Sequence, residues 1–407
     1  MTALTYDYRA RDKSGTIHSG QMEGSSPSAV AGTLREKGYI PLRIDARKST
    51  TLQKEIQIPG FKKKVKTKDI AIFSRQLSTM VNSGLTLIRA LTILDEQTEN
   101  AVLKRVIGEV RTTVEQGSSL SAALEAHPKV FNNLYVSMVR AGEVGGALDE
   151  TLVRLADTLE ASVRLRSKVK SAMAYPIVVL VLIVVIVTGM LVFVVPIFES
   201  MYDDLGGTLP VPTQLLISIS GILTGFWWLI LFGVVGSITG FKRWKQTEAG
   251  LAAWDRLKVK FPVFGPLVQK ISISRFARTF AVLSRTGVPV LQTLDIVSST
   301  SGNWLMSEAT KDIQASVKRG ESLVSPLHRH DIFPPMVVHM MAVGEETGAL
   351  DTMLAKVADF YDAEVEDMVN AMTSLIEPLL IVVMGVVVGG ILISLYLPMF
   401  NIANLIQ

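Results

Sequence analysis

The sequence of 407 residues contains no cysteine. This absence excludes disulfide bonds, cysteine-ligated zinc and catalysis by a thiol. The dipeptide Gly-Lys does not occur either, so the chain lacks the phosphate-binding loops GxxxxGKS and GxxxxGKT. If the protein takes part in mechanical work, we expect another chain to hydrolyse the nucleotide.

Histidine is scarce, with five in the chain. The segment "HRHD" at 328–331 has no histidine pair at the helical i, i+4 spacing, which argues against a metal site. No nucleophile stands beside a base in a recognisable motif. We therefore predict a protein that is not an enzyme and has no catalytic residue, cofactor or metal site, and we expect no nucleic acid among its partners.

Charge is missing from three long stretches. Residues 177–195 and 379–397 form runs of 19 uncharged residues, and a third run covers 215–238. A 19-residue helix is roughly 29 Å long, close to the bilayer's hydrocarbon thickness of about 30 Å. Charge-free runs of this length are rare in soluble cores, which makes buried helices the weaker alternative. We predict membrane helices at 175–198, 214–241 and 377–400.

Basic residues near these spans indicate their orientation, because they favour the cytoplasmic side. Four precede the first span, at Arg164, Arg166, Lys168 and Lys170, whereas the following loop at 199–213 holds only acidic charges. We predict a membrane protein with residues 1–174 and 242–376 in the cytoplasm and with 199–213 and 401–407 outside. The "WW" at 227–228 is unexpected in mid-span, since tryptophan favours the membrane interface.

A direct repeat organises the chain. "AGEVGGALD" at 141–149 and "VGEETGALD" at 343–351 share six positions at a spacing of 202 residues. Further matches follow at spacings of 202 or 203, among them Pro176 with Pro378 and Arg75 with Arg278. The chain therefore contains two copies of a unit of about 130 residues, each of which runs into an apolar span.

The soluble parts differ in their hydrophobic patterns. Residues 4–46 alternate like short strands around one helix, which indicates a small α+β module at 1–58. A basic linker follows at 59–66. Its charges lie beside anionic lipid or an acidic partner, or they are only solvated. Apolar residues at helical spacing and short Gly/Ser breaks predict antiparallel helical bundles at 67–174 and, after a linker, within 242–376, where the repeat begins at about 270. The predicted fold class is mainly α and integral to the membrane.

The repeated acidic turn has two interpretations. Its glycines allow backbone angles closed to other residues, and its acids lie near the start of the next helix, where the macrodipole favours negative charge. The turn is then only a helix cap. Because both copies place Glu directly after Gly, we also hypothesise a surface for partners. The candidate residues are Gly142, Glu143, Gly146 and Asp149 in the first copy and Gly344, Glu345, Gly348 and Asp351 in the second.

Two arginines offer an intramolecular alternative for these acids. Arg75 and Arg278 occupy matching positions in the two copies. Each could pair with the glutamate of its own turn, which would make the acids structural, or could itself belong to the surface that contacts a partner.

The spans contain few residues that suggest specific contacts. Two glycine pairs, Gly221 with Gly225 and Gly385 with Gly389, have the spacing that lets membrane helices pack closely. The only ionisable group at a span's edge is Glu377, directly before Pro378, and it either faces cytoplasmic water or has a function. The first span begins correspondingly at Pro176. The spans lack the buried charges that a transport path requires.

The whole pattern resembles the type II secretion system F family, the inner-membrane platform proteins of type IV pili and type II secretion. The resemblance is carried by "FSRQLSTMVNSGLTLIRAL" at 73–91 and "FARTFAVLSRTGVPVLQTL" at 276–294, by the two GExxGALD turns, and by "KVKSAMAYP" at 168–176. In the second copy "TSLIEP" replaces "SAMAYP".

This resemblance implies a place in the bacterial inner membrane, bundles of six helices, self-association into a homo-oligomer and a non-enzymatic role. Such platforms couple a cytoplasmic hexameric ATPase to pilins or pseudopilins, together with other inner-membrane assembly components. The sequence favours the pilus over secretion only weakly. A transporter built from parallel repeats is the alternative, opposed by the count of three spans and the absence of a polar site at mid-membrane.

Overall fold

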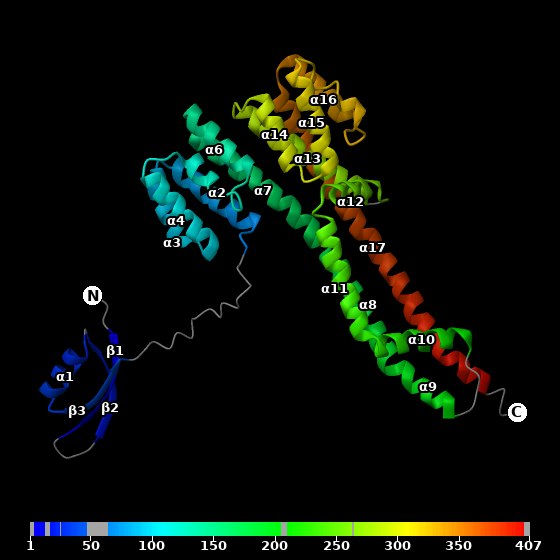
Figure 1. Ribbon diagram of the computed structural model, residues 1–407, viewed down its shortest axis with the longest axis horizontal. Helices are drawn as coiled ribbons and strands as arrows, with labels where there is room; N and C mark the ends of the chain where they lie inside the picture. Colours follow the sequence, from blue (N-terminus) through cyan, green and yellow to red (C-terminus); the bar gives the residue numbers. More distant parts are fainter. Residues whose placement is uncertain are drawn as a thin grey trace. The chain divides into compact units, whose positions relative to one another are not determined.

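The computed structural model describes residues 4–12, 17–24, 26–46, 64–204, 210–262 and 264–402 (Figure 1). The basic linker up to residue 63, the external loop at 205–209 and the external tail from 403 lie outside the described residues, as do parts of the predicted module at 1–58 and residue 263. The chain divides into two compact units, Met1–Lys62 and Lys63–Gln407.

The first unit is the small α+β module that the alternating pattern predicts. Its strands β1 (Leu4–Arg11), β2 (Ile17–Gly24) and β3 (Ile40–Ala46) form an antiparallel sheet in the order β2-β1-β3. Helix α1 (Pro27–Glu36) begins at Ser26, whose hydroxyl accepts the Ala29 N–H, and ends before Gly38, which has φ +81°. Burying the apolar face of α1 against β1 forms the core, made of Tyr6, Ala10, Val30 and Leu34.

The first repeat consists of helices joined by short turns. Polar N-caps start several of them, for instance Thr86, Asn100 and Asn132, whose side chains accept backbone N–H groups of the first turn. The aromatic rings of Phe73, Phe131 and Tyr135 meet in the core. The helices are α2 (Thr67–Asn82), α3 (Leu87–Gln97), α4 (Ala101–Glu115), α5 (Leu120–Glu125), α6 (Asn133–Gly145) and α7 (Leu148–Ala172).

The second repeat has its helices in the same order, with one element exchanged. Where the first repeat has α5, the second has only the 3-10 turn η2 (Leu327–Arg329). Proline is the cause, because Pro326 matches Ala123 in the middle of α5 and cannot donate a backbone hydrogen bond. The other helices are α13 (Phe264–Arg285), α14 (Val290–Thr300), α15 (Trp304–Lys318), α16 (Pro335–Thr347) and α17 (Leu350–Ile402).

An additional helix, α12 (Glu248–Lys260), precedes the second repeat in a region that the sequence analysis assigned only as a linker. It packs against the beginning of α15. The buried carboxylate of Asp255 accepts the backbone N–H of Trp304 at 2.8 Å, and the Arg256 guanidinium lies 4.8 Å from the Trp304 ring centre. These contacts cap α15 from outside the repeat.

The last helix of each repeat extends far beyond its domain. Helix α7 continues through α8 (Ala174–Gly189), the π segment η1 (Met190–Val194) and α9 (Val195–Asp204). By length and composition, Leu148–Met201 and Leu350–Leu397 are the two single helices in the described chain that could cross a membrane. In Figure 1, α17 runs out of the second repeat as one unbroken ribbon.

The membrane helix predicted at 214–241 is not straight. It consists of α10 (Val211–Gly225) and α11 (Trp227–Trp244), which meet at an angle of 77°. Phe226 leaves the helical region with φ −116° and ψ 23°. The pair Trp227 and Trp228 therefore occupies the first turn of α11 instead of the middle of a helix, which accounts for its unexpected position in the sequence.

Two hydroxyl groups hold α10 against the long helices. Ser220 donates to the carbonyl of Leu191 in η1, and Thr213 donates to the carbonyl of Ser394 in α17, both at 2.5 Å. Apolar contacts join the same elements around Leu191, Val195, Ile391 and Leu395. Helix α10 thus links the extensions of the two repeats.

We predict that Ser220→Ala lowers the free energy of unfolding by about 1 kcal/mol, because the Leu191 carbonyl loses its buried partner. The control is Ser218→Ala, since Ser218 is exposed and donates only within α10, to the carbonyl of Gln214. Denaturant unfolding of the purified protein in mild detergent measures both. Equal midpoints for the two variants would contradict the assigned role of Ser220.

Candidate functional site

Each acidic turn joins the last two helices of a repeat. Gly146 ends α6 with φ +69° and Gly348 ends α16 with φ +71°. Both lie in the left-handed region that glycine enters without strain, as the sequence predicted for a helix end.

Gly142 and Gly344 serve a different purpose from the predicted one, because neither has a positive φ. A Cβ at Gly142 would stand 2.8 Å from the Cβ of Thr151 and 3.2 Å from the Cα of Leu148. At Gly344 it would stand 3.0 Å from the Cα of Leu350. These glycines therefore permit the close approach of consecutive helices, α6 to α7 and α16 to α17.

Glu143 is also placed differently from the sequence prediction, which put it near the start of α7. It lies in the last turn of α6, and its half-buried carboxylate caps α5 instead. The carboxylate accepts the N–H of Leu120 at 2.5 Å, the N–H of Ser121 at 3.1 Å and the hydroxyl of Ser121 at 2.5 Å. A negative charge at a helix N-terminus satisfies amide donors that the helix itself leaves free.

Glu345 repeats this arrangement in the second copy. Its carboxylate accepts the N–H of Leu323 at 2.8 Å and the hydroxyl of Ser322 at 2.6 Å. The glutamate of the first turn thus caps α5, and the glutamate of the second turn binds the segment that precedes η2. The sequence of the turn alone does not reveal this long-range contact. The contact explains why an ordinary Ser or Asn cap would not replace the glutamate.

Arg75 and Arg278 do not pair with the turn glutamates, so the intramolecular pairing considered in the sequence analysis is wrong. Arg75 binds Glu160 at 2.7 Å and Asp157 at 2.5 Å. Arg278 binds Asp362 at 2.6 Å and Asp359 at 3.1 Å. Each arginine joins the first helix of its repeat to the last one, at a level of the domain away from the turn.

The four acids of these pairs were missed in the sequence, although a signal existed. Asp157 matches Asp359, and Glu160 matches Asp362, at the same spacing of 202 that relates the turns. The hydrogen bond from Arg75 lowers the pKa of Glu160. The pair therefore stabilises the fold at neutral pH and ceases to do so as pH falls through the pKa of the folded state. Because both side chains are partly exposed, water weakens the effect.

The remaining predicted residues are scattered. Asp149 is exposed in the first turn of α7, and Asp351 pairs with Arg285 at 3.1 Å. Pro176 is buried near the start of α8, whereas Glu377 and Pro378 are exposed on α17. A Cβ would meet no other atom within 4 Å at any glycine of the two spaced pairs, Gly221, Gly225, Gly385 and Gly389.

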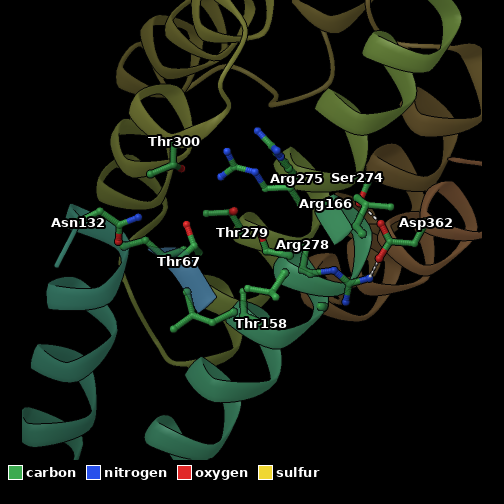
Figure 2. Close-up of a pocket in the computed structure, with 16 residues that line it drawn as sticks. Thr67, Asn132, Thr158, Arg166, Ser274, Arg275, Arg278, Thr279, Thr300 and Asp362 are labelled. Carbon is green, nitrogen blue, oxygen red and sulfur yellow. Dashed lines mark hydrogen bonds and ion pairs between the residues drawn. The ribbon is translucent and has the colours of Figure 1, made fainter. Parts of the chain in front are cut away.

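A cavity of about 240 Å³, open to water, lies between the two repeats (Figure 2). Its walls come from α7 and the starts of α2 and α6 on one side, and from α13, α17 and the end of α14 on the other. Four charged residues line it: Arg166, Arg275, Arg278 and Asp362. Over the described part of the chain, no three histidine or acidic side chains gather in a way that could hold a metal ion.

We predict that Glu143→Ala destabilises α5, with a loss of about 2 kcal/mol, because buried amide groups lose a charged acceptor. Asp149→Ala, which removes an exposed acid from the same turn, should cost less than about 1 kcal/mol. Hydrogen exchange at the amides of Leu120 and Ser121 measures the local effect. Unchanged protection of these amides in Glu143→Ala would disprove the cap.

Comparison with known proteins bears out the resemblance. Residues 73–196 and again 276–398 match the family described as "Type II secretion system (T2SS), protein F", and residues 1–45 match its N-terminal domain. The two matched segments each contain one acidic turn and one long apolar helix. The repeat found in the sequence is therefore the repeat of this family.

Three relatives cover nearly the whole chain. "Type IV pilus assembly protein PilC" of Myxococcus xanthus is 42% identical over 400 residues, 98% of this chain and 95% of the relative. PilC of Thermus thermophilus is 42% identical over 398 residues, 98% of each chain. "Type II secretion system protein F" of Xanthomonas campestris is 36% identical over 402 residues, 98% of this chain and 99% of the relative. The chain belongs to the type II secretion system protein F family.

Proposed function

We propose that this protein is a non-enzymatic inner-membrane platform of a type IV pilus or type II secretion system. In this role it couples a cytoplasmic hexameric ATPase to the insertion of pilin or pseudopilin subunits into a fibre. Family membership supports the assembly role, and the 42% identity to two proteins named for pilus assembly favours the pilus. The absence of a phosphate-binding loop supports an external source of energy.

One observation carries the coupling proposal: each repeat ends in a helix that continues into an apolar segment. Leu148–Met201 has 54 residues and Leu350–Leu397 has 48. An α-helix keeps all its backbone hydrogen bonds within itself and is stiff along its axis. A partner that displaces a repeat therefore displaces the apolar half of the same helix.

The two long helices also contact each other, so their movements are joined. Near the repeats, Lys168 of α7 pairs with Glu366 of α17, and apolar residues of both helices share a cluster that includes Val169 and Val369. At the far end, α10 ties both together through Ser220 and Thr213. A force on one repeat reaches both extensions.

The acidic turns remain candidate surfaces for partners in this proposal. The carboxylates of Glu143 and Glu345 are occupied within the repeats, which leaves other atoms of the turns for contact. Val144 is 87% exposed and Asp149 is also exposed. An apolar side chain bordered by an acidic one fits a partner with a basic rim around an apolar site, such as the ATPase or another assembly component.

In the membrane we propose the arrangement that the basic residues indicate, with both repeats in the cytoplasm and 199–213 and the C-terminal tail outside. The open space beside Gly385 and Gly389 supports their use in a homo-oligomer contact, since glycine lets helix backbones approach closely.

We predict that Thr208→Cys reacts with a membrane-impermeant thiol reagent in intact cells, whereas Ser118→Cys reacts only after lysis. The native chain has no cysteine, so the background is zero. Ser118 is exposed in the first repeat, and a lack of labelling therefore reports the membrane and not burial. Labelling of position 118 in intact cells would reverse the proposed orientation.

We predict that Asn370→Pro abolishes fibre assembly, because proline removes a hydrogen bond from α17 between the second repeat and the apolar segment and kinks the helix. Asn370 is exposed, so Asn370→Ala at the same position is a control that keeps the helix. Fibres are counted in cells, and membrane insertion and ATPase co-purification are checked in parallel. Normal assembly by an inserted Asn370→Pro protein would refute coupling through α17.

One observation favours the alternative of a transporter, namely the break between α10 and α11, because discontinuous helices form substrate sites in transporters. The break is flanked by Gly225, Phe226 and Trp227, which offer no charged group to a substrate. Substrate uptake by the reconstituted protein would decide for this alternative.

A further inference from the structure

The cavity between the repeats contains an imbalance of charge. Three arginines and one aspartate line it. The aspartate, Asp362, is already engaged, since it accepts the guanidinium of Arg278 at 2.6 Å and the hydroxyl of Ser274. Arg166 of α7 and Arg275 of α13 remain without a carboxylate partner among the residues that the structure describes.

These two arginines lie on opposite repeats and face the same space. Figure 2 shows their guanidinium groups next to each other, on the side of the cavity away from Asp362. Loss of hydration lowers the pKa of Arg275, and the positive charge of Arg166 lowers it further. The side chain is nonetheless exposed, because the cavity is open to water. Two like charges are thus held together at a position where a negative charge would relieve their repulsion.

The neighbouring groups are predominantly donors. Asn132 uses its amide oxygen to cap α6 by accepting the N–H of Tyr135 at 3.0 Å, which leaves its NH₂ group, drawn towards the cavity in Figure 2. Thr67 and Thr279 contribute hydroxyl groups to the lining. Asn132 and Thr67 also mark the beginnings of α6 and α2, so the positive ends of two helix dipoles border the cavity.

We infer that this cavity is a binding site for a phosphate-type oxyanion, held between Arg166 of the first repeat and Arg275 of the second, with Asn132 and the threonine hydroxyls as further donors. A guanidinium binds phosphate through two parallel hydrogen bonds, and two such groups from opposite sides match a tetrahedral oxyanion.

The size of the cavity limits the ligand. A volume of about 240 Å³ is below the range of roughly 300–1,000 Å³ that encloses a drug-sized molecule. The ligand is therefore a small oxyanion such as phosphate or pyrophosphate, or the terminal phosphates of a larger molecule whose remainder stays in solvent.

The position of the cavity favours a soluble anion over a lipid headgroup. Arg166 precedes Pro176 by ten residues of nearly continuous helix, which corresponds to roughly 15 Å along the axis. The headgroup layer extends only about 5–8 Å beyond the hydrocarbon. Phosphate-bearing lipids share the required chemistry, and the experiment below distinguishes the two sources.

Binding would join the repeats. Arg166 belongs to the helix that runs from the first repeat towards the membrane, and Arg275 belongs to the first helix of the second repeat. An anion that holds both stiffens the junction between them, and its release loosens it. The site therefore offers control over how movements of one repeat reach the other.

The test uses the full chain in nanodiscs of neutral phosphatidylcholine, with chloride at matched ionic strength. Pyrophosphate and phosphate are titrated by calorimetry and by their effect on Tm. We expect saturable binding and a rise in Tm. Arg166→Gln or Arg275→Gln should weaken the affinity at least about tenfold and should reduce the rise in Tm. Arg164→Gln is the matched control, because Arg164 lies on the same helix but does not line the cavity; its affinity should stay within about twofold of the native value.

Measurements without added oxyanion separate binding from structure. Arg275→Gln should leave Tm unchanged or raise it in chloride alone, because the substitution removes a like-charge contact. Nanodiscs containing phosphatidylglycerol form the lipid arm: a rise in Tm that depends on Arg166 and Arg275 and that reduces pyrophosphate binding would make a headgroup the ligand. The inference is overturned if neither oxyanion nor anionic lipid raises Tm, or if all three variants respond like the native protein.

Discussion

The last helix of each repeat joins a domain core to a long apolar segment, and this constraint governs the structure. In their first halves, the helices Leu148–Met201 and Leu350–Leu397 present one apolar face to a domain core and their other faces to water. Their second halves are apolar on all sides, and in a membrane only intrahelical hydrogen bonds would satisfy the backbone there. Helix α17 meets both requirements without a break, whereas Leu148–Met201 contains the turn at Met173 and the π segment η1. The ion pairs Arg75–Glu160 and Arg278–Asp362 fix the water-facing half to the first helix of the repeat, while apolar contacts and the hydroxyl groups of α10 hold the other half.

Duplication preserved the contacts that close each domain and changed the ones that surround it. The carboxylate cap, the left-handed glycine and the arginine with two acids occur in both repeats. Around this shared frame, Pro326 reduces α5 to the turn η2, and α12 caps α15 through Asp255. The cavity between the repeats combines different helices of the two copies, since α7 of the first copy and α13 of the second line it. A feature at the junction of two copies has no counterpart within either copy.

Sequence patterns predicted the features that depend on neighbouring residues. The repeat, the apolar segments, the N-terminal α+β module and the left-handed Gly146 and Gly348 follow from spacing and composition. Contacts between distant segments could not be predicted in this way: Glu143 reaches α5 across more than 20 residues, and Arg75 reaches Glu160 across 85. The bend at Phe226 was hidden because an uninterrupted apolar run is compatible with both a straight and a broken helix. Arg166 was interpreted only as a marker of orientation, since nothing local to α7 indicates that Arg275 faces it.

The close approach at Gly142 has a mechanical consequence. Because Gly142 has no side chain, α6 and α7 cross closely here. A Cβ at this position would force the two helices apart. The crossing lies near the beginning of a helix of 54 residues, which is roughly 80 Å long. If that helix moved as a rigid body about the glycine contact, a rotation of one degree would move its far end by about 1.4 Å. The close contact at Gly142 therefore bears on where the far end of this 54-residue helix lies.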